Sequence, residues 1–228
     1  MASIKITPKK TNASDMLFLA VMAYLCLLIE PVLHYLIVWT PLIDYVPIGD
    51  MWWTLILRVS CCALWTVAAL IVIKCSRGCG FDPVGDTKNV TKLQWAMLGG
   101  CALLFTVLIV VLDGGIKETV DRLIDDGNLV YIVSRLIFEA FQVAVMVLVL
   151  SLGQKWGDLL LKKENKYIPF GGIVLGVCMM LMNLITGGFS IVALMVLGIQ
   201  LFNGMVFLLA GKKALIAAPF IYFVFVIM

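Results

Sequence analysis

Long apolar runs separated by short polar connections make up most of the chain. Seven runs stand out, with approximate limits 16–39, 51–74, 94–113, 129–152, 168–186, 189–210 and 213–228. A helix needs about 20 apolar residues to cross the hydrocarbon core of a bilayer, because each residue rises about 1.5 Å along the axis. The pattern therefore predicts an all-α, polytopic transmembrane bundle of about seven spans, six of full length and a shorter seventh.

The composition supports a lipid environment. Of the 228 residues, 63% are apolar and 14% are charged, whereas a soluble domain carries about 25% charged residues to wet its surface. No connection is long enough to bury a core of its own, so residues 1–228 are predicted to form a single membrane-embedded domain. The net charge of +3 gives no indication of a nucleic-acid partner, and the bilayer itself is the expected surrounding.

Lysine and arginine are distributed unevenly between the connections. Thirteen fall in the N-terminal tail and in the connections after the second, fourth and sixth runs: Lys5, Lys9, Lys10, Lys74, Arg77, Lys88, Lys92, Lys155, Lys162, Lys163, Lys166, Lys212 and Lys213. The opposite connections carry only Lys117 and Arg122. Because cytoplasmic loops are enriched in these residues, we expect a multi-pass protein of the cell membrane with its N-terminus inside and its C-terminus outside.

Several polar side chains interrupt the apolar runs. An ionisable group inside a bilayer costs about 2.5–3.5 kcal/mol on insertion scales, so each one indicates a partner or a function. These candidate binding residues are Glu30 and His34 in the first run, Arg58 in the second, Arg135, Glu139 and Gln142 in the fourth, Asn183 in the fifth, and Gln200 and Asn203 in the sixth.

The ionisable members of this set lie at similar depth. Counted from the predicted outer ends, Glu30, His34, Arg58, Arg135 and Glu139 fall within one layer roughly 10 Å thick. We expect contacts of Arg135 with Glu139 along one helix and of Arg58 with Glu30 between helices. Two interpretations remain open: paired charges that hold the helices together, and a polar cavity that binds or processes a ligand.

Proline and glycine add local detail to the predicted bundle. Pro31 follows Glu30 directly and should kink the first span, because proline removes one backbone hydrogen bond. The glycines near the fifth run allow neighbouring helices to approach closely; they are Gly171, Gly172, Gly176, Gly187 and Gly188.

Cys75 and Cys79 form a C-x-x-x-C pair, but a metal site needs more ligands and the only histidine is His34. Neither a metal nor another cofactor is predicted.

Three stretches in the second half of the chain resemble the CPBP (also called ABI or CAAX-protease-like) family of membrane proteins. RLIFEAFQVAVMVLVLSLGQ, at 135–154, resembles the family helix that carries a Glu-Glu-x-x-x-Arg motif. IPFGGIVLGVCMMLMNLITGG, at 168–188, resembles the next helix, which usually carries Phe-x-x-x-His. GIQLFNGMVFLLAGKK, at 198–213, resembles the helix that follows. The resemblance covers about 135–210, a third of the chain.

The resemblance implies an intramembrane endopeptidase in which a glutamate activates water. Glu139 would then be the catalytic carboxylate, and Asn183 and Asn203 would support the oxyanion. The chain departs from the family motifs, because Glu139 stands alone, the downstream arginine is missing, and Asn183 occupies the position of the usual histidine. Whether the chain is an enzyme is left open: it is an active hydrolase, or a degenerate relative that binds a peptide or a partner membrane protein. The alternative is a small transporter or accessory subunit that uses the Glu/His/Arg layer.

Overall fold

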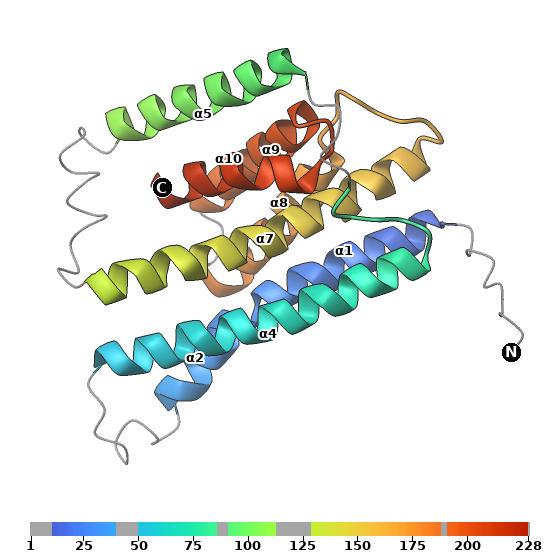
Figure 1. The fold of residues 1–228 in the computed structure, drawn as a ribbon. Helices are drawn as coiled ribbons and strands as arrows, with labels where there is room; N and C mark the ends of the chain where they lie inside the picture. The colour runs from blue at the N-terminus through green and yellow to red at the C-terminus, as the bar shows by residue number, and fades with distance from the viewer. Residues whose placement is uncertain (1–10, 40–49, 86–90, 113–128, 188–190, 228) are drawn as a thin grey trace, which may run out of the picture.

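The described part of the chain is helical. The computed structural model describes residues 11–39, 50–85, 91–112, 129–187 and 191–227, and within these ranges it contains helices but no strand. The helices form one bundle in which α1 and α2 run in the same direction and the helices after them alternate in direction (Figure 1). Their bounds are α1 Ala13–Leu27, α2 Ile29–Trp39, α4 Asp50–Gly78, α5 Lys92–Leu112, α7 Leu129–Leu160, α8 Phe170–Gly187, α9 Ile191–Leu209 and α10 Ala214–Ile227.

The predicted first span is broken, as the proline predicts. The α1 helix ends at Leu27 and α2 begins at Ile29. Pro31 has no N–H to donate, and its ring clashes with the carbonyl four residues earlier, which is that of Leu27. A side chain of the neighbouring α4 bonds the backbone beside this break: the indole Nε1 of Trp65 donates a 2.7 Å hydrogen bond to the carbonyl of Cys26.

The centre of the bundle is α7, which contacts α1, α4, α8, α9 and α10. Val143 and the continuous run 145–154 are all buried, so this part of the helix is covered on every side. A helix that is apolar all round belongs in such a position. The helix continues eight residues beyond the predicted end of its span, to Leu160.

Glycine allows α8 to pack directly on α7 and α9. A Cβ atom on Gly171 would collide with the backbone of Leu150, and one on Gly172 with the carbonyl of Gln200. A Cβ on Gly176 would lie 2.7 Å from Cδ1 of Leu197. The predicted close approach is therefore confirmed for these three glycines; Gly187 ends α8, and Gly188 lies outside the described residues.

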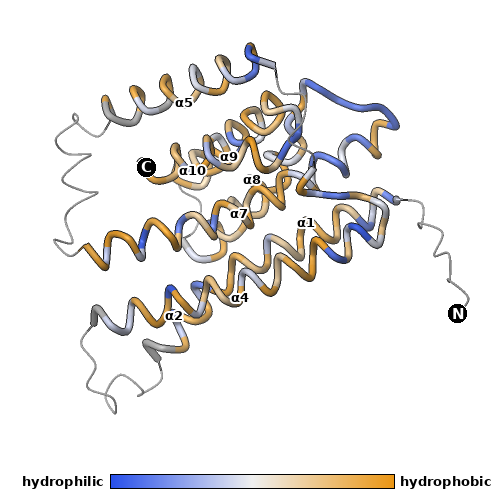
Figure 2. The backbone as a smooth tube through the Cα atoms, viewed as in Figure 1, coloured by the Kyte–Doolittle hydropathy of each residue, from blue (hydrophilic) through white to orange (hydrophobic). Residues whose placement is uncertain are grey.

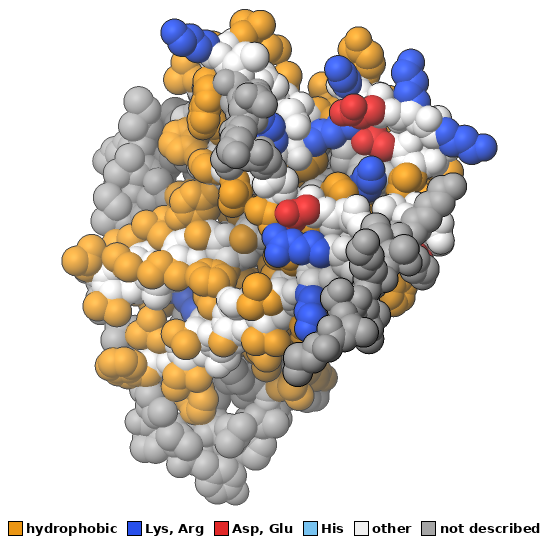
Figure 3. Space-filling view, turned by 45° about the vertical axis from the view of Figure 1, so that its right-hand side comes forward, with side chains coloured by type: hydrophobic (Ala, Val, Ile, Leu, Met, Phe, Trp, Pro, Cys, Tyr) orange, Lys and Arg blue, Asp and Glu red, His pale blue; other side chains and the backbone are white. Residues whose placement is uncertain are grey.

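The outer surface of the bundle is apolar over most of its length. Large hydrophobic side chains are exposed on several helices, among them Phe18 at 64%, Val59 at 67% and Leu103 at 67%. The space-filling view shows charged groups gathered toward one end and hydrophobic atoms over most of the remaining described surface (Figure 3). Exposed apolar area of this extent is incompatible with a water-facing surface and fits contact with lipid.

Among the described residues, four helical stretches are long and apolar enough to cross a membrane: Ala13–Leu36, Trp52–Gly78, Leu129–Leu160 and Ile191–Leu209. The stretches Lys92–Leu108, Phe170–Thr186 and Ala214–Val226 are apolar but shorter. These findings support a membrane protein.

The lysine-containing connections meet at one end of the bundle, which we call the lysine-rich end. It comprises the start of α1, residues 79–85 after α4, residues 161–169 after α7 and residues 210–213 after α9. Hydrophilic positions concentrate there, at the right of the view (Figure 2). Cross-connections hold the segments together: the Thr11 hydroxyl donates to the Cys79 carbonyl at 2.7 Å, and Lys212 pairs with Asp158.

Candidate functional site

A cavity of about 320 Å³ lies among α2, α4, α7 and α10. We call it the polar-layer cavity, because most members of the predicted polar layer line it. Its lining residues are Glu30 from α2, Thr54, Leu57 and Arg58 from α4, Arg135, Phe138, Glu139 and Gln142 from α7, and Phe225 from α10. The structure thus brings together four of the five ionisable residues that the sequence places at one depth, and Gln142 joins them.

The Arg135–Glu139 contact predicted within one helix is confirmed. Nε of Arg135 donates to Oε1 of Glu139 at 2.8 Å, four residues along α7. The carboxylate is 9% exposed as a residue, so water screens this pair less than a surface pair. The second carboxylate oxygen, Oε2, is buried and accepts no hydrogen bond from the described residues. This oxygen is therefore a buried acceptor of a residue that lines the cavity.

The guanidinium of Arg58 has different partners from those expected. Its Nη1 donates to the Tyr131 carbonyl at 3.1 Å and to the Ser134 hydroxyl at 2.8 Å. The group also lies 4.0 Å from the centre of the Tyr131 ring, at the distance of a cation–π interaction. Within the described ranges Arg58 makes no ion pair with Glu30, because the first turns of α7 reach its guanidinium instead.

The Glu30 carboxylate is left with spare hydrogen-bonding capacity. It makes no hydrogen bond or ion pair with any described residue, although it lines the cavity beside Arg58. Its position in the first turn of α2 places it near the positive end of the helix dipole, which favours a negative charge. His34, one turn further along α2, is exposed and is not part of the cavity lining.

The other three amide side chains named as candidates, those of Asn183, Gln200 and Asn203, lie elsewhere. Asn183 donates to the Met179 carbonyl of its own helix at 3.0 Å, which is a local contact within α8. Asn203 and Gln200 are buried in α9 and bond each other at 3.0 Å. The other amide oxygen, Oδ1 of Asn203, is buried without a partner among the described residues. Neither asparagine lines the polar-layer cavity.

Sequence reasoning missed several contributors to this cavity. Tyr131 and Ser134 hold Arg58, and the Ser134 hydroxyl also donates to the Tyr131 carbonyl at 2.7 Å. Their signal was modest: a serine directly before Arg135 in an otherwise apolar run. The α10 helix was also missed as a wall, although Tyr222 fixes it to α7 through a 3.0 Å hydrogen bond to the Leu136 carbonyl.

The described residues contain no group of three or more histidine, cysteine, aspartate or glutamate side chains arranged to hold a metal ion.

Comparison of the chain with family models, with curated proteins and with solved structures finds no match. The similarity to CPBP proteins therefore stays a prediction, and the geometry of the cavity carries the functional argument.

Proposed function

We propose that the chain is a multi-pass membrane protein of seven spans, with its N-terminus in the cytoplasm, and that it binds a small cationic solute in the polar-layer cavity for transport. Four long apolar stretches and the exposed apolar surface support the membrane location. The lysine-rich end supports the orientation, since such connections stay cytoplasmic. In intact cells, antibodies should bind a C-terminal epitope tag but should reach an N-terminal tag only after permeabilisation.

The observation that carries the binding proposal is the buried, unpartnered Oε2 of Glu139. Leaving a buried charged acceptor unsatisfied costs more than the roughly 1–3 kcal/mol of a neutral group. Glu30 adds a second carboxylate to the cavity lining, and no described residue donates a hydrogen bond to it. Both guanidinium groups, in contrast, already have protein partners. Of the described residues that line the cavity, Glu139 is the one with a buried side-chain atom lacking a partner, and that atom is an acceptor. This favours a ligand that brings hydrogen-bond donors and positive charge.

A peptidase mechanism fits this geometry less well. It needs a carboxylate that activates water, with oxyanion donors on the opposite side of the scissile bond. Here Glu139 is held by Arg135, while Asn183 and Asn203 bond within their own helices, away from the cavity lining. A cavity of about 320 Å³ suits an amine or a guanidinium group better than an extended peptide.

Uptake of radiolabelled guanidinium into proteoliposomes tests the binding proposal. Wild-type protein should give saturable uptake, and Glu139→Gln should lower it at least tenfold, because the neutral amide no longer attracts a cation. Glu30→Gln should also reduce uptake. Asp82→Asn is the matched control: this carboxylate is exposed, pairs with Arg77 and lies outside the polar-layer cavity, so its uptake should equal that of wild type. Unsaturable uptake, or equal effects of Glu139→Gln and Asp82→Asn, would show that the cavity does not bind the cation.

A further inference from the structure

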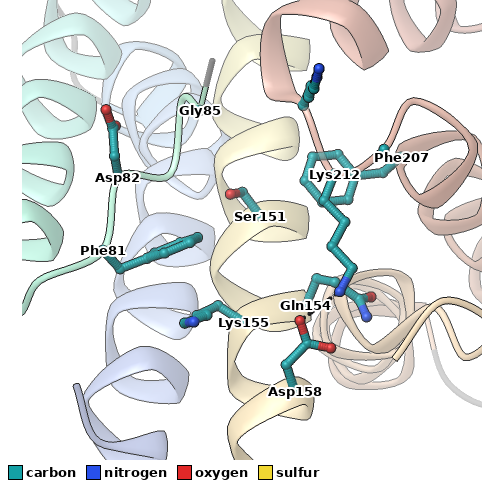
Figure 4. A pocket seen from close by; sticks show the side chains of 11 residues that line it. Phe81, Asp82, Gly85, Ser151, Gln154, Lys155, Asp158, Phe207 and Lys212 are labelled. Atoms are coloured by element: carbon teal, nitrogen blue, oxygen red, sulfur yellow. Dashed lines mark hydrogen bonds and ion pairs between the residues drawn. The ribbon is translucent and has the colours of Figure 1, made fainter. Parts of the chain in front are cut away.

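A second cavity opens at the lysine-rich end, away from the polar-layer cavity. Its volume is about 430 Å³, and it lies between α7, residues 81–85 and the loop that joins α9 to α10. A neighbouring hollow of about 520 Å³ shares Phe81, Lys155, Asp158 and Lys212 with it. The close-up shows side chains from these three segments around one space (Figure 4). We call the two hollows together the basic cavity.

Positive charge exceeds negative charge around the basic cavity. Five lysines line it, namely Lys155, Lys162, Lys163, Lys212 and Lys213, against the three carboxylates of Asp82, Asp158 and Glu164. The carboxylates already have partners. Asp158 accepts from Nζ of Lys212 at 2.6 Å and from the backbone N–H of Asn165 at 2.9 Å. Asp82 pairs with Arg77, and Lys212 also lies 3.5 Å from Glu164.

Three of the lysines have no acidic partner in the part of the chain that the structure describes. Lys155, Lys162 and Lys163 form no ion pair with any residue in the described ranges. Lys155 is the best placed of them, because it is half-buried and its Nζ lies 5.5 Å from the centre of the Phe81 ring. An ammonium group held against a wall of the cavity without a counter-ion favours an anionic ligand there.

The wall of the basic cavity is fixed by bonds that leave these lysines available. The buried Ser151 hydroxyl donates to the Pro83 carbonyl at 2.7 Å and holds the segment after α4 against α7. Gln154, also buried, donates to the Ile168 carbonyl at 3.3 Å. A ligand therefore meets a formed cavity, and little ordering of the backbone is needed on binding.

Exposed apolar side chains beside the lysines indicate the kind of anion. Leu160 is 56% exposed, Leu161 48%, Ile168 44% and Tyr167 84%, and all four lie at the same end as the basic cavity. Lysines next to apolar and aromatic groups are typical of the membrane interface, where headgroups and acyl chains meet. A free phosphate would contact only the lysines of this surface. A phospholipid would contact the lysines through its headgroup and the apolar side chains through its acyl chains.

We propose that the basic cavity binds the phosphate of an anionic phospholipid, with Lys155 and Lys163 as its main charged contacts and the acyl chains along the adjacent apolar surface. Lys212 and Asp158 form one wall of the site. This proposal is independent of solute binding in the polar-layer cavity, because the two cavities share no lining residue.

Lipid titration of the purified full chain in mild detergent tests the proposal. Binding of phosphatidylglycerol and of phosphatidylcholine is measured by native mass spectrometry, and we expect phosphatidylglycerol to bind at least tenfold more tightly. The double variant Lys155→Gln/Lys163→Gln should lose about fivefold in affinity per lysine. The control Lys74→Gln/Lys92→Gln removes the same charge from exposed positions that do not line the basic cavity, and it should keep the preference.

Three results would overturn the proposal. Equal binding of the two lipids shows that there is no anionic site, and equal losses in the two double variants show diffuse attraction without a site. Competition by soluble glycerol phosphate at concentrations similar to those of the lipid shows a free-phosphate site instead. The single variant Lys163→Gln changes an exposed side chain and so leaves folding intact; a loss of about fivefold in this variant supports the proposal even if the double variant unfolds.

Discussion

Replacement of Gly204 by alanine tests whether α8 and α9 are in backbone contact. A Cβ atom at this position would lie 2.8 Å from both Cα and N of Gly172 and 2.9 Å from Cβ of Pro169. Carbon atoms pack best at about 3.5–4.0 Å, so α8 would have to move away by roughly 0.7–1.2 Å. Overpacking of this kind costs about 1–3 kcal/mol.

Gly198→Ala is the matched control for this substitution. Gly198 lies in the same helix, and a Cβ there would meet nothing within 4 Å. Both substitutions gain the same helix propensity, up to about 1 kcal/mol, so the difference between the variants isolates the steric cost. We expect Gly204→Ala to melt roughly 3–10 °C below Gly198→Ala.

Thermal unfolding of both purified variants in mild detergent, followed by far-ultraviolet circular dichroism, gives this comparison directly. Equal melting temperatures would refute the reasoning, because they would show that the α8–α9 interface has room for a methyl group. A lower melting temperature for Gly198→Ala would contradict it more strongly, since that position is open.

Three further substitutions are checked by the same melting experiment. Trp65→Phe should cost about 1–3 kcal/mol, because it leaves the Cys26 carbonyl at the break between α1 and α2 without its indole donor. Asp158→Asn should destabilise by about 1–3 kcal/mol, less than a fully buried pair, because the Lys212 and Asp158 side chains are 19% and 14% exposed. Arg77→Gln should change stability by less than about 0.5 kcal/mol, because its ion pair is more than half exposed.

The sequence was most informative about features that depend on local spacing. The Arg135–Glu139 pair needs only two residues four positions apart on one helix, and it is present at 2.8 Å. The break beside Pro31 likewise follows from covalent structure. The shared depth of Glu30, Arg58 and Glu139 followed from counting residues along predicted spans, and the three line one cavity.

Contacts between helices were harder to predict, because they depend on how far one helix slides along its neighbour. A shift of one turn, about 5.4 Å, changes which side chain an arginine reaches. Arg58 therefore bonds Ser134 and the Tyr131 carbonyl instead of Glu30. The basic cavity was missed for a related reason. Phe81, Ser151 and Lys212 come from three segments that are distant in the sequence, and the local sequence around each one does not indicate that they meet.

The buried, apolar stretch of α7 separates the two cavities of the bundle. Glu139 in the polar-layer cavity and Lys155 in the basic cavity lie on the same helix, sixteen positions apart, or about 24 Å along its axis. Between them, Val143 and the run 145–150 are apolar and buried, and such side chains offer water no hydrogen-bond partner. The apolar stretch thus separates the two cavities along α7 in this conformation. The solute transport proposed above requires the helices around this stretch to rearrange, a motion of microseconds to milliseconds.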